Sequence, residues 1–272
     1  MPSESETGSG IERDEALRRL RAAPERAAVL TDVDGTLAPI VERPEEAAVP
    51  ARASELLEEL SRRFAIVACV SGRQALEARR LVGARGVAYA GNHGLELLPP
   101  GAGEPLLDEG LKGDGGAAAR FVAELGAERL AGGLRLEDKG PIQALHWRGA
   151  ANEEAAEAAA RQIAERAGEA GLRPHWGRKV LELRPASGGG KDAAVSALLA
   201  GREIEIAAYA GDDRTDLDAF RRLRELRGEG SLAAAFCIGV TSSEGPAELA
   251  ELADLRMDGP AAWAAFLEAL AE

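Results

Sequence analysis

Lysine is scarce in this 272-residue chain, which contains four lysines and 29 arginines. Positive charge is therefore supplied mainly by arginine, and each lysine has a raised chance of being chosen for its compact ammonium group. Acidic residues outnumber basic ones, 46 to 33, so the net charge is −13. This balance argues against a nucleic-acid-binding protein, which needs a basic face. It leaves room for a phosphorylated small molecule, since a single site can be locally positive.

Cysteine is almost absent, and so are long apolar runs. The two cysteines, Cys69 and Cys237, lie in apolar segments, which predicts buried thiols and neither a disulfide nor a zinc site. No apolar stretch approaches the roughly 18–20 residues of a membrane span. Residues 1–10 are rich in Ser, Glu and Gly and lack the apolar segment of a signal peptide. We therefore expect a cytoplasmic monomer without a membrane partner, and a disordered tail over residues 1–12.

Buried strands and helices alternate along most of the chain. The apolar run that ends at Thr31 opens the series, and its length and turn-forming neighbours predict a buried strand. Further strands are predicted at 64–70, 86–90, 204–210 and 232–240, and helices at 51–63, 74–82, 191–199, 216–226 and 261–271. This alternation predicts an α/β fold with a parallel sheet and right-handed crossovers.

The pattern changes in the middle of the chain. There it runs helix, strand, strand twice over, with helices at 115–130 and 153–170 and strands at 134–138, 142–148, 172–176 and 180–184. This order predicts an α+β domain of about 80 residues inserted into the α/β fold. We expect a core over residues 13–104 and 187–272, and an inserted domain over residues 105–186.

Polar side chains follow four of the predicted core strands, at the point where each strand ends. If the strands are parallel, these ends meet at one edge of the sheet, where open α/β sheets bind ligands. Lys191, at the start of a predicted helix, can reach the same edge. The residues expected there are Asp32 and Asp34, Ser71, Asn92 and His93, and Asp212 and Asp213.

The types of these residues suit phosphate chemistry with a metal. Asp32 and Asp34 repel each other unless a cation or a shared proton relieves them, and carboxylate oxygens with room for water suit Mg²⁺. A hydroxyl, an ammonium and exposed amides suit a phosphate, and a carboxylate can attack phosphorus to form an aspartyl-phosphate. Plainer interpretations stay open: a helix cap for Asp32 or Ser71, a turn for Asn92-His93, a surface turn for Asp212-Asp213, and a solvated helix start for Lys191.

Six short motifs contain these residues and others in the inserted domain. They are Asp32-Val33-Asp34-Gly35-Thr36-Leu37, Ser71-Gly72-Arg73, Gly91-Asn92-His93-Gly94-Leu95-Glu96, Glu137-Asp138-Lys139-Gly140, Lys179-Val180-Leu181-Glu182 and Gly211-Asp212-Asp213-Arg214-Thr215-Asp216. Taken together, these motifs resemble the haloacid-dehalogenase-like phosphatases, and most closely the trehalose-6-phosphate phosphatases. Thr31 stands where an apolar residue is commoner, and Asp192 follows Lys191 where Gly is usual.

The resemblance implies a Rossmann-like core with an inserted cap, and Mg²⁺-dependent hydrolysis of trehalose 6-phosphate through an aspartyl-phosphate. Asp32 would be the nucleophile and Asp34 the general acid and base. Ser71 and Lys191 would bind the phosphoryl oxygens. The metal would be held by Asp32, the backbone carbonyl of Asp34, and Asp212. Further substrate contacts in the core are expected from Gly35, Thr36, Gly72, Arg73, Asn92 and His93.

In the cap, successive side chains of a strand point to opposite faces of the sheet, and this strand parity selects the residues expected to hold sugar hydroxyls. Glu137 and Lys139 are two positions apart and share one face of a strand, as do Arg178 and Glu182, which are four apart. Lys179 points the other way and would contact the substrate only if a bulge intervened. The plainer interpretation is a set of cross-strand ion pairs on a solvated face. For the two His-Trp pairs, at 146–147 and 175–176, core packing is favoured over stacking on a sugar.

Other functions remain compatible with the sequence. A phosphatase could act on another phosphorylated sugar or glycoside, such as mannosyl- or glucosyl-3-phosphoglycerate or sucrose phosphate, and a phosphohexomutase would have a similar cap. A non-catalytic sugar-phosphate sensor could use the same fold, although the intact pair of Asp32 and Asp34 argues against it.

Overall fold

The computed structural model describes residues 4–41, 46–108, 111, 115–126, 133–177, 179–241 and 245–272, with only the backbone described at 4–12 and 250. The chain divides into two compact units. The larger comprises residues 1–106 and 189–272, and the smaller comprises residues 107–188. The predicted inserted domain, 105–186, lies two residues from this division at each junction.

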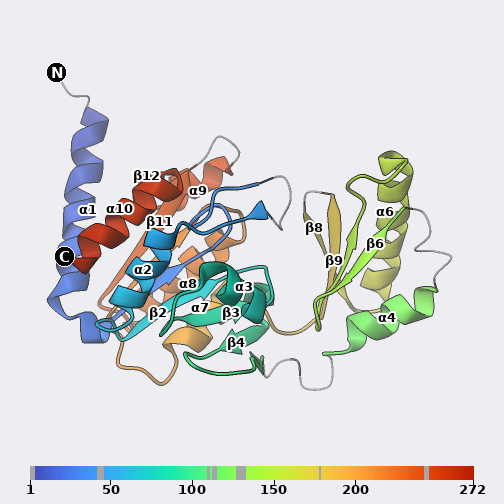
Figure 1. Ribbon diagram of the computed structural model, residues 1–272, viewed down its shortest axis with the longest axis horizontal. Coiled ribbons are helices and arrows are strands. Elements are labelled where there is room, and N and C mark those ends of the chain that lie inside the picture. Colours follow the sequence, from blue (N-terminus) through green and yellow to red (C-terminus); the bar gives the residue numbers. More distant parts are fainter. Residues whose placement is uncertain are drawn as a thin grey trace. The chain divides into compact units, whose positions relative to one another are not determined.

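The larger unit is built on an eight-stranded sheet in the order β12-β11-β10-β1-β2-β3-β4-β5 (Figure 1). β1 lies inside the sheet and pairs in parallel with both β10 and β2, whereas β4 runs antiparallel to β3. The strands are β1 (Ala27–Thr31), β2 (Ile66–Val70), β3 (Ala88–Gly91), β4 (Glu96–Leu98), β5 (Leu106–Leu107), β10 (Ile206–Gly211), β11 (Ala234–Thr241) and β12 (Leu255–Asp258).

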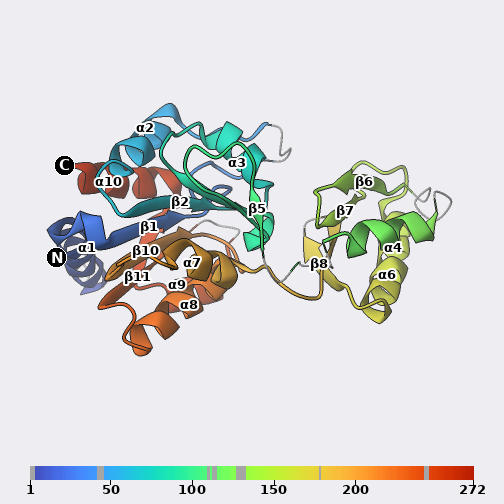
Figure 2. The same cartoon turned by 90° about the horizontal axis from the view of Figure 1, so that it is seen from below.

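Helices cover both faces of this sheet, as a buried parallel sheet requires. Figure 2 shows α2, α3 and α10 on one side and α7, α8 and α9 on the other. Side chains of β1 alternate accordingly, with Val29 in the first hydrophobic cluster and Leu30 in the second. The helices are α1 (Glu4–Ala22), α2 (Ala51–Leu60), α3 (Ala75–Val82), α7 (Lys191–Leu199), α8 (Asp216–Gly228), α9 (Ala247–Leu252) and α10 (Gly259–Ala271). The predicted α/β class is confirmed.

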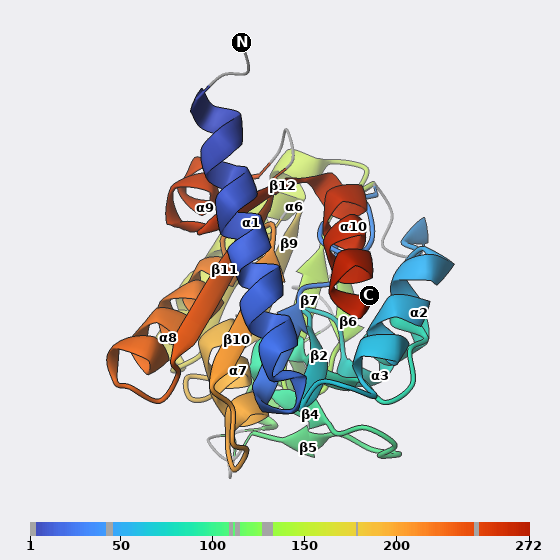
Figure 3. The same ribbon diagram turned by 90° about the vertical axis from the view of Figure 1, so that its left-hand side faces the viewer.

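The amino-terminal segment differs from the predicted disordered tail, because the backbone is helical from Glu4 onward. Farther along α1, Ala16, Leu17 and Leu20 are buried in the core, and Figure 3 shows the helix passing beside α10.

The smaller unit repeats helix, strand, strand twice, as predicted. Its four strands form an antiparallel sheet in the order β6-β7-β9-β8. Leu145 and Leu181 on this sheet pack with both helices in one hydrophobic cluster, so the helices lie against one face. The face without helices, which we call the open face, carries Ala144 and Glu182. The elements are α4 (Ala117–Leu125), β6 (Arg135–Asp138), β7 (Gln143–His146), α6 (Glu153–Glu169), β8 (Arg173–Gly177) and β9 (Val180–Arg184).

Two expectations drawn from composition can be compared with the structure. Cys69 and Cys237 are both free thiols and buried, and burial raises the pKa of each; the prediction of buried, unpaired cysteines is confirmed. Within the described part of the chain, every helix is too short or too polar to cross a lipid bilayer.

Candidate functional site

Buried carboxylates gather at the carboxyl edge of the core sheet. Thr31 and Ala210 are partners in the β1–β10 register, and the Asp32 N–H donates to the Ala210 carbonyl at 2.8 Å. Asp32 and the residues after β10 therefore leave the sheet side by side. Carboxylate oxygens of Asp32, Asp212 and Asp216 all lie within 4.8 Å of one another, and all three side chains are buried.

Lys191 joins this cluster from the first position of α7. Its Nζ lies 3.0 Å from Asp32 Oδ2 and 2.6 Å from Asp216 Oδ1, and the residue is only 3% exposed. Burial lowers the pKa of Lys191, but the carboxylates of Asp216 and Asp32 outweigh burial and raise it overall, which keeps the ammonium charged. The interpretation of Lys191 as a solvated helix start is therefore wrong.

Asp216 is a member of the site that our sequence reasoning did not select. It is the first residue of α8 and completely buried, and four donors occupy its carboxylate. Lys191 and the Tyr209 hydroxyl, at 2.7 Å, donate to Oδ1. The N–H groups of Asp212 and Asp213 donate to Oδ2 at 3.0 and 2.9 Å. Asp216 thus anchors the turn after β10, and its place as the last residue of Gly-Asp-Asp-Arg-Thr-Asp was the available signal.

The charge of the cluster favours a bound cation. Three carboxylates face one ammonium, and burial raises the pKa of Asp32 well above its usual value despite the opposing effect of Lys191. Burial, followed by the neighbouring Asp216, raises the pKa of Asp212 to about 7. Hydrogen-bond donors already occupy both carboxylate oxygens of Asp216. Asp32 and Asp212 are therefore the carboxylates that fit a hard divalent cation such as Mg²⁺.

Gly35 and Thr36 support Asp212 from the loop after β1. The Thr36 hydroxyl donates to Asp212 Oδ1 at 2.8 Å. Gly35 has φ of +89°, and a Cβ atom there would lie 2.0 Å from Asp212 Oδ2. Only glycine therefore suits this position, because both the backbone conformation and the close approach exclude a side chain. In the structure these two predicted substrate contacts orient a carboxylate.

Asp34 lies with Arg73, where the guanidinium binds both of its oxygens. The Nε–Oδ2 and Nη2–Oδ1 distances are 2.8 and 2.9 Å, which is the bidentate geometry of a strong ion pair. Arg73 also donates to Glu77 at 2.5 Å. Asp34 is 41% exposed, whereas Arg73 is largely buried. Arg73, which was predicted as a substrate contact, is in this structure the partner of the predicted acid and base.

The loop after β3 connects the ends of two other elements. Asn92 and His93 adopt left-handed φ values of 47° and 54°, which are uncommon outside glycine and concentrate at functional sites. The His93 N–H donates to the Ser71 carbonyl at 3.0 Å, and its carbonyl accepts from Gly190 N–H at 2.5 Å. The ring of His93 lies against Gly72, where a Cβ atom would be 2.7 Å from Nε2. The backbone of His93 thus links the ends of β2 and the start of α7.

Ser71 does not cap the helix that follows it. Its hydroxyl accepts from the Arg73 N–H at 3.1 Å and is fully buried. The N-cap position of α3 is Gln74, and the first helical N–H, at Ala75, donates to Glu96 at 2.8 Å. Glu96 also accepts from the Asn92 amide at 2.8 Å. Sequence reasoning included Glu96 in the motif after β3 but gave it no role, and in the structure it is the acceptor that supports this loop.

Ion pairs cross the open face of the smaller unit. Lys139 Nζ lies 2.9 Å from Glu182 Oε1, and Arg184 contacts the other oxygen of Glu182 at 2.7 Å. Glu137 pairs with His146 at 2.7 Å, and this hydrogen bond is the main reason that the pKa of Glu137 is lowered. The cross-strand pairs considered above are therefore present. One joins Lys139 and Glu182, two residues predicted to bind the sugar, and the other joins Glu137 to His146.

Lys179 belongs to the opposite side of this sheet, as strand parity predicts. Its Nζ contacts Glu153, at the amino end of α6, at 2.6 Å. The predicted substrate contact Arg178 lies outside the described residues.

The tryptophans of the two His-Trp pairs are also on the helix side of the sheet. Trp147 is buried in the cluster beneath the helices, and Trp176 packs edge-on against it at 5.9 Å, so the favoured packing role of Trp147 is confirmed.

Comparison with known proteins identifies the family. A family model described as trehalose-phosphatase matches residues 30–253. The chain belongs to this family. It is 34% identical over 253 residues to a trehalose-phosphate phosphatase of Mycolicibacterium paratuberculosis, covering 90% of this chain and 62% of that protein. It is 35% identical over 208 residues to an uncharacterized glycosyl hydrolase of Mycobacterium tuberculosis, covering 73% of this chain but 15% of that protein. The chain therefore spans less than two thirds of the length of these relatives.

A solved structure supports the same fold. The C-terminal domain of the Candida albicans trehalose-6-phosphate phosphatase matches with a TM-score of 0.71 at 21% sequence identity, covering 95% of this chain and 96% of that one. At this identity the likeness shows the fold, and the chemistry has to be argued from the residues of the site.

We expect Mg²⁺ to stabilise this trehalose-phosphatase family member against unfolding, and Asp212→Asn to remove most of the effect. A ligand at 100 times its dissociation constant adds about 2.7 kcal/mol, and the cation would bind where carboxylates crowd one another. The measurement is a thermal melt with Mg²⁺ or with a chelator, for the wild type and Asp212→Asn. An equal Mg²⁺-dependent shift in both proteins would contradict the assignment of Asp212 as a ligand.

Proposed function

We propose that the protein is a Mg²⁺-dependent phosphatase that hydrolyses trehalose 6-phosphate to trehalose and phosphate through an aspartyl-phosphate. The observation that carries this proposal is the contact of Lys191 with Asp32 beside Asp212, all buried at the carboxyl edge of a parallel sheet. Membership of the trehalose-phosphatase family supports the reaction and the substrate class.

Asp32 would attack phosphorus in line, so that its carboxylate oxygen bonds to phosphorus as the bond to the sugar oxygen breaks. The departing oxygen takes a proton from Asp34, and Asp34 then takes a proton from the water that cleaves the aspartyl-phosphate. The Lys191 ammonium, 3.0 Å from Asp32 Oδ2, would neutralise negative charge on the transferring group. Mg²⁺ held by Asp32 and Asp212 would supply further charge neutralisation there.

The bidentate ion pair with Arg73 has a consequence for Asp34. Because Arg73 occupies both oxygens of Asp34, proton donation to the substrate requires that Asp34 first leaves the guanidinium. Glu77, at 2.5 Å from Arg73, remains as a partner for that charge. We infer that substrate binding separates the pair and frees Asp34 for its role as an acid.

We further infer that the open face of the smaller unit binds the sugar. Lys139, Glu137 and Glu182 have donors and acceptors suited to hydroxyl groups, and they lie on one face with parity as predicted. Lys139 pairs with Glu182, and Glu137 pairs with His146, so sugar hydroxyls would have to replace or extend these contacts. The remote part of the substrate would then supply binding energy that the chemical step can use.

Asp34→Asn should slow phosphoryl transfer from a sugar phosphate about a hundredfold while having a much smaller effect on transfer from p-nitrophenyl phosphate. A sugar alkoxide needs a proton in order to leave, whereas nitrophenolate leaves without one. The single-turnover rate of leaving-group release measures the difference, because the later cleavage of the aspartyl-phosphate also uses Asp34 and is common to both substrates. Equal losses on the two substrates would contradict the role of Asp34 as a general acid.

Lys139→Met and Lys179→Met form a matched pair on the two faces of one sheet. We expect Lys139→Met to raise KM for trehalose 6-phosphate about tenfold, as expected for losing a charge-assisted hydrogen bond, and to leave turnover of p-nitrophenyl phosphate unchanged. Lys179→Met removes only a surface pair with Glu153 and should change neither value. If Lys179→Met had the larger effect on KM, the assignment of the sugar-binding face would be wrong.

A panel of phosphorylated sugars and glycosides tests the function itself. Trehalose 6-phosphate should have the highest kcat/KM, ahead of sucrose phosphate, mannosyl- and glucosyl-3-phosphoglycerate and glucose 6-phosphate. Equal turnover across the panel would refute the specificity for trehalose 6-phosphate. Tight binding without turnover would instead indicate a sugar-phosphate sensor.

A further inference from the structure

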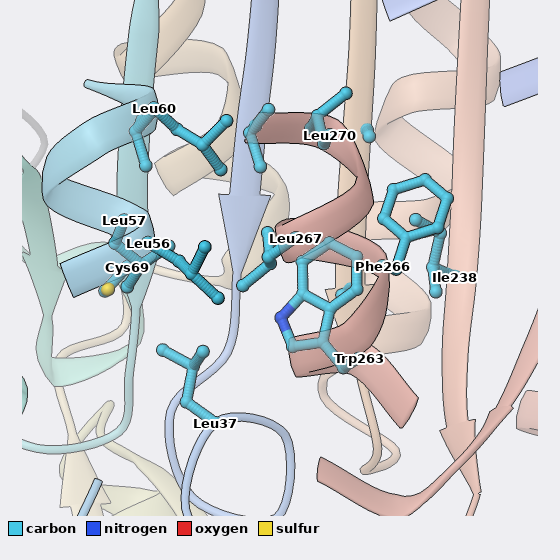
Figure 4. Packing of buried hydrophobic residues seen from close by; sticks show 14 of the residues in the cluster. Leu37, Leu56, Leu57, Leu60, Cys69, Ile238, Trp263, Phe266, Leu267 and Leu270 are labelled. Atoms are coloured by element: carbon cyan, nitrogen blue, oxygen red, sulfur yellow. The ribbon is translucent and has the colours of Figure 1, made fainter. Parts of the chain in front are cut away.

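Trp263, on the last helix, makes a buried hydrogen bond with the strand that carries Asp32. Its indole N–H donates to the Thr31 hydroxyl at 3.1 Å, and both residues are completely buried. Figure 4 shows the indole beside β1, packed with Phe266 and Leu267, and with its ring nitrogen turned toward that strand. The Trp263 and Phe266 rings are stacked with centroids 5.4 Å apart, which holds the indole in place.

The Thr31 hydroxyl also makes a hydrogen bond to the backbone of Asp32. It accepts from Trp263 and donates to the Asp32 carbonyl at 2.8 Å. Every peptide bond in the described residues is trans, and a trans peptide is planar, with its N–H opposite its carbonyl. Fixing the Asp32 carbonyl therefore also fixes the direction of the Val33 N–H. It also fixes the backbone torsion on the carboxyl side of the Asp32 Cα, the atom that carries the side-chain carboxylate.

The other peptide of Asp32 is fixed independently, since the Asp32 N–H donates to Ala210 within the sheet. The chain leaves β1 at this point, so the ladder holds only the amino side of Asp32. The hydroxyl of Thr31 is the contact that holds its carbonyl side. Valine at position 31 would fill the same space but would leave the buried indole N–H and the Asp32 carbonyl without this partner.

We propose that Trp263 and Thr31 are positioning residues for the nucleophile, acting through the Asp32–Val33 peptide to orient the Asp32 carboxylate. The inference rests on the proposed function, because it assigns the two residues to the phosphoryl-transfer step. It extends the site to α10, whose sequence carries no catalytic motif. The conformation of Asp32 thus depends on a tryptophan about 230 residues later in the chain.

The hydrogen bond can be tested apart from activity. In a ¹⁵N–¹H spectrum of the full chain, the three tryptophans give three indole signals, and the Trp263 signal is assigned with Trp263→Phe. Thr31→Val should shift that signal, whereas Thr31→Ser, which keeps the hydroxyl, should leave it near its wild-type position. An unchanged signal in Thr31→Val would refute the contact.

The positioning role is tested by single-turnover phosphoryl transfer and by steady-state kinetics. Thr31→Val and Trp263→Phe should each lower kcat roughly tenfold, as expected for a slightly misplaced nucleophile, with KM unchanged within about twofold. Thr31→Ser should restore most of the rate. The double variant should be no slower than the slower single variant, because both break the same chain of contacts.

Tyr89→Phe is the matched control. It removes another buried hydrogen bond of the same unit, from the Tyr89 hydroxyl to the Ala84 carbonyl at 2.8 Å, and should lower stability without changing kcat. Wild-type kcat in well-folded Thr31→Val, or a loss equal to that of Tyr89→Phe, would refute the positioning role while leaving the proposed function intact. A wild-type protein without phosphatase activity would refute the function itself, and the positioning role with it.

Discussion

Replacing Asp32 by Asn should abolish phosphatase turnover, lowering kcat by at least about 10⁴-fold, as removal of a covalent nucleophile does elsewhere. The amide has nearly the same shape but cannot attack phosphorus. The measurement is kcat with trehalose 6-phosphate, together with a search for the covalent intermediate by acid quench. Unchanged turnover in Asp32→Asn would refute Asp32 as the nucleophile.

The same substitution should leave the metal-free fold at least as stable as the wild type. Burial raises the pKa of Asp32, so the folded state disfavours its ionised form. When the folded state raises the pKa of a carboxyl, the protein loses stability as the pH rises above the pKa of that carboxyl in the unfolded chain, which is about 3.9 for Asp. Asp32→Asn removes this cost. Its advantage over the wild type should therefore be present at pH 7 and disappear near pH 3, as measured by chemical denaturation in a chelator. A large loss of stability at pH 7 would contradict this.

Asp216→Asn should destabilise the protein by about 3 kcal/mol and also remove activity. Four donors converge on the Asp216 carboxylate, and an amide nitrogen cannot accept from two of them. Lys191 would keep only Asp32 as a charged partner, and breaking a buried ion pair from one side costs about 3–5 kcal/mol. Denaturant unfolding gives the change in free energy, and kcat gives the effect on the displaced Lys191.

Asp218→Asn provides the control for this measurement on the same helix. Asp218 pairs with Arg221 one turn away, and its side chain is 47% exposed. An exposed pair of this kind contributes less than about 1 kcal/mol, so stability and turnover should stay close to the wild type. If the two variants were equally stable, Asp216 would not be the anchor of the turn after β10.

Local patterns were sufficient to predict the interior elements. The strand Val180–Arg184 and the helix Lys191–Leu199 have the predicted bounds, because an apolar alternation and a clear helix start are written within a few residues. The elements that were missed lie near the edges of the core sheet. β12 alternates buried and exposed positions over only four residues, and α9 has six residues, too few for a periodicity to be recognised.

Local patterns likewise predicted some residues of the candidate site and not others. Asp32, Lys191 and Asp212 were found because each stands at the end or start of a predicted element. The partners of these residues were not found, since they depend on distant contacts. The pairing of Asp34 with Arg73 and the donation from Tyr209 to Asp216 join residues by geometry, and no spacing rule links Thr31 to Trp263. The ion pairs of Lys139 and Lys179 lie on opposite faces of the sheet, as the sequence predicts, although Lys179 itself stands in the turn before β9 with φ of 60°.

The pairing of β1 with β10 also constrains how the chain folds. Ala27 is the partner of Ile206, so β1 cannot pair with β10 until roughly 180 further residues have been synthesised. Their synthesis takes about 10–35 s on a ribosome. During that interval residues 107–188 emerge in full and can fold as a contiguous unit. One edge of an apolar strand stays unpaired meanwhile and is open to aggregation. Newly made chains should therefore depend on chaperones mainly before β10 is available, and fragments that end before it should be insoluble.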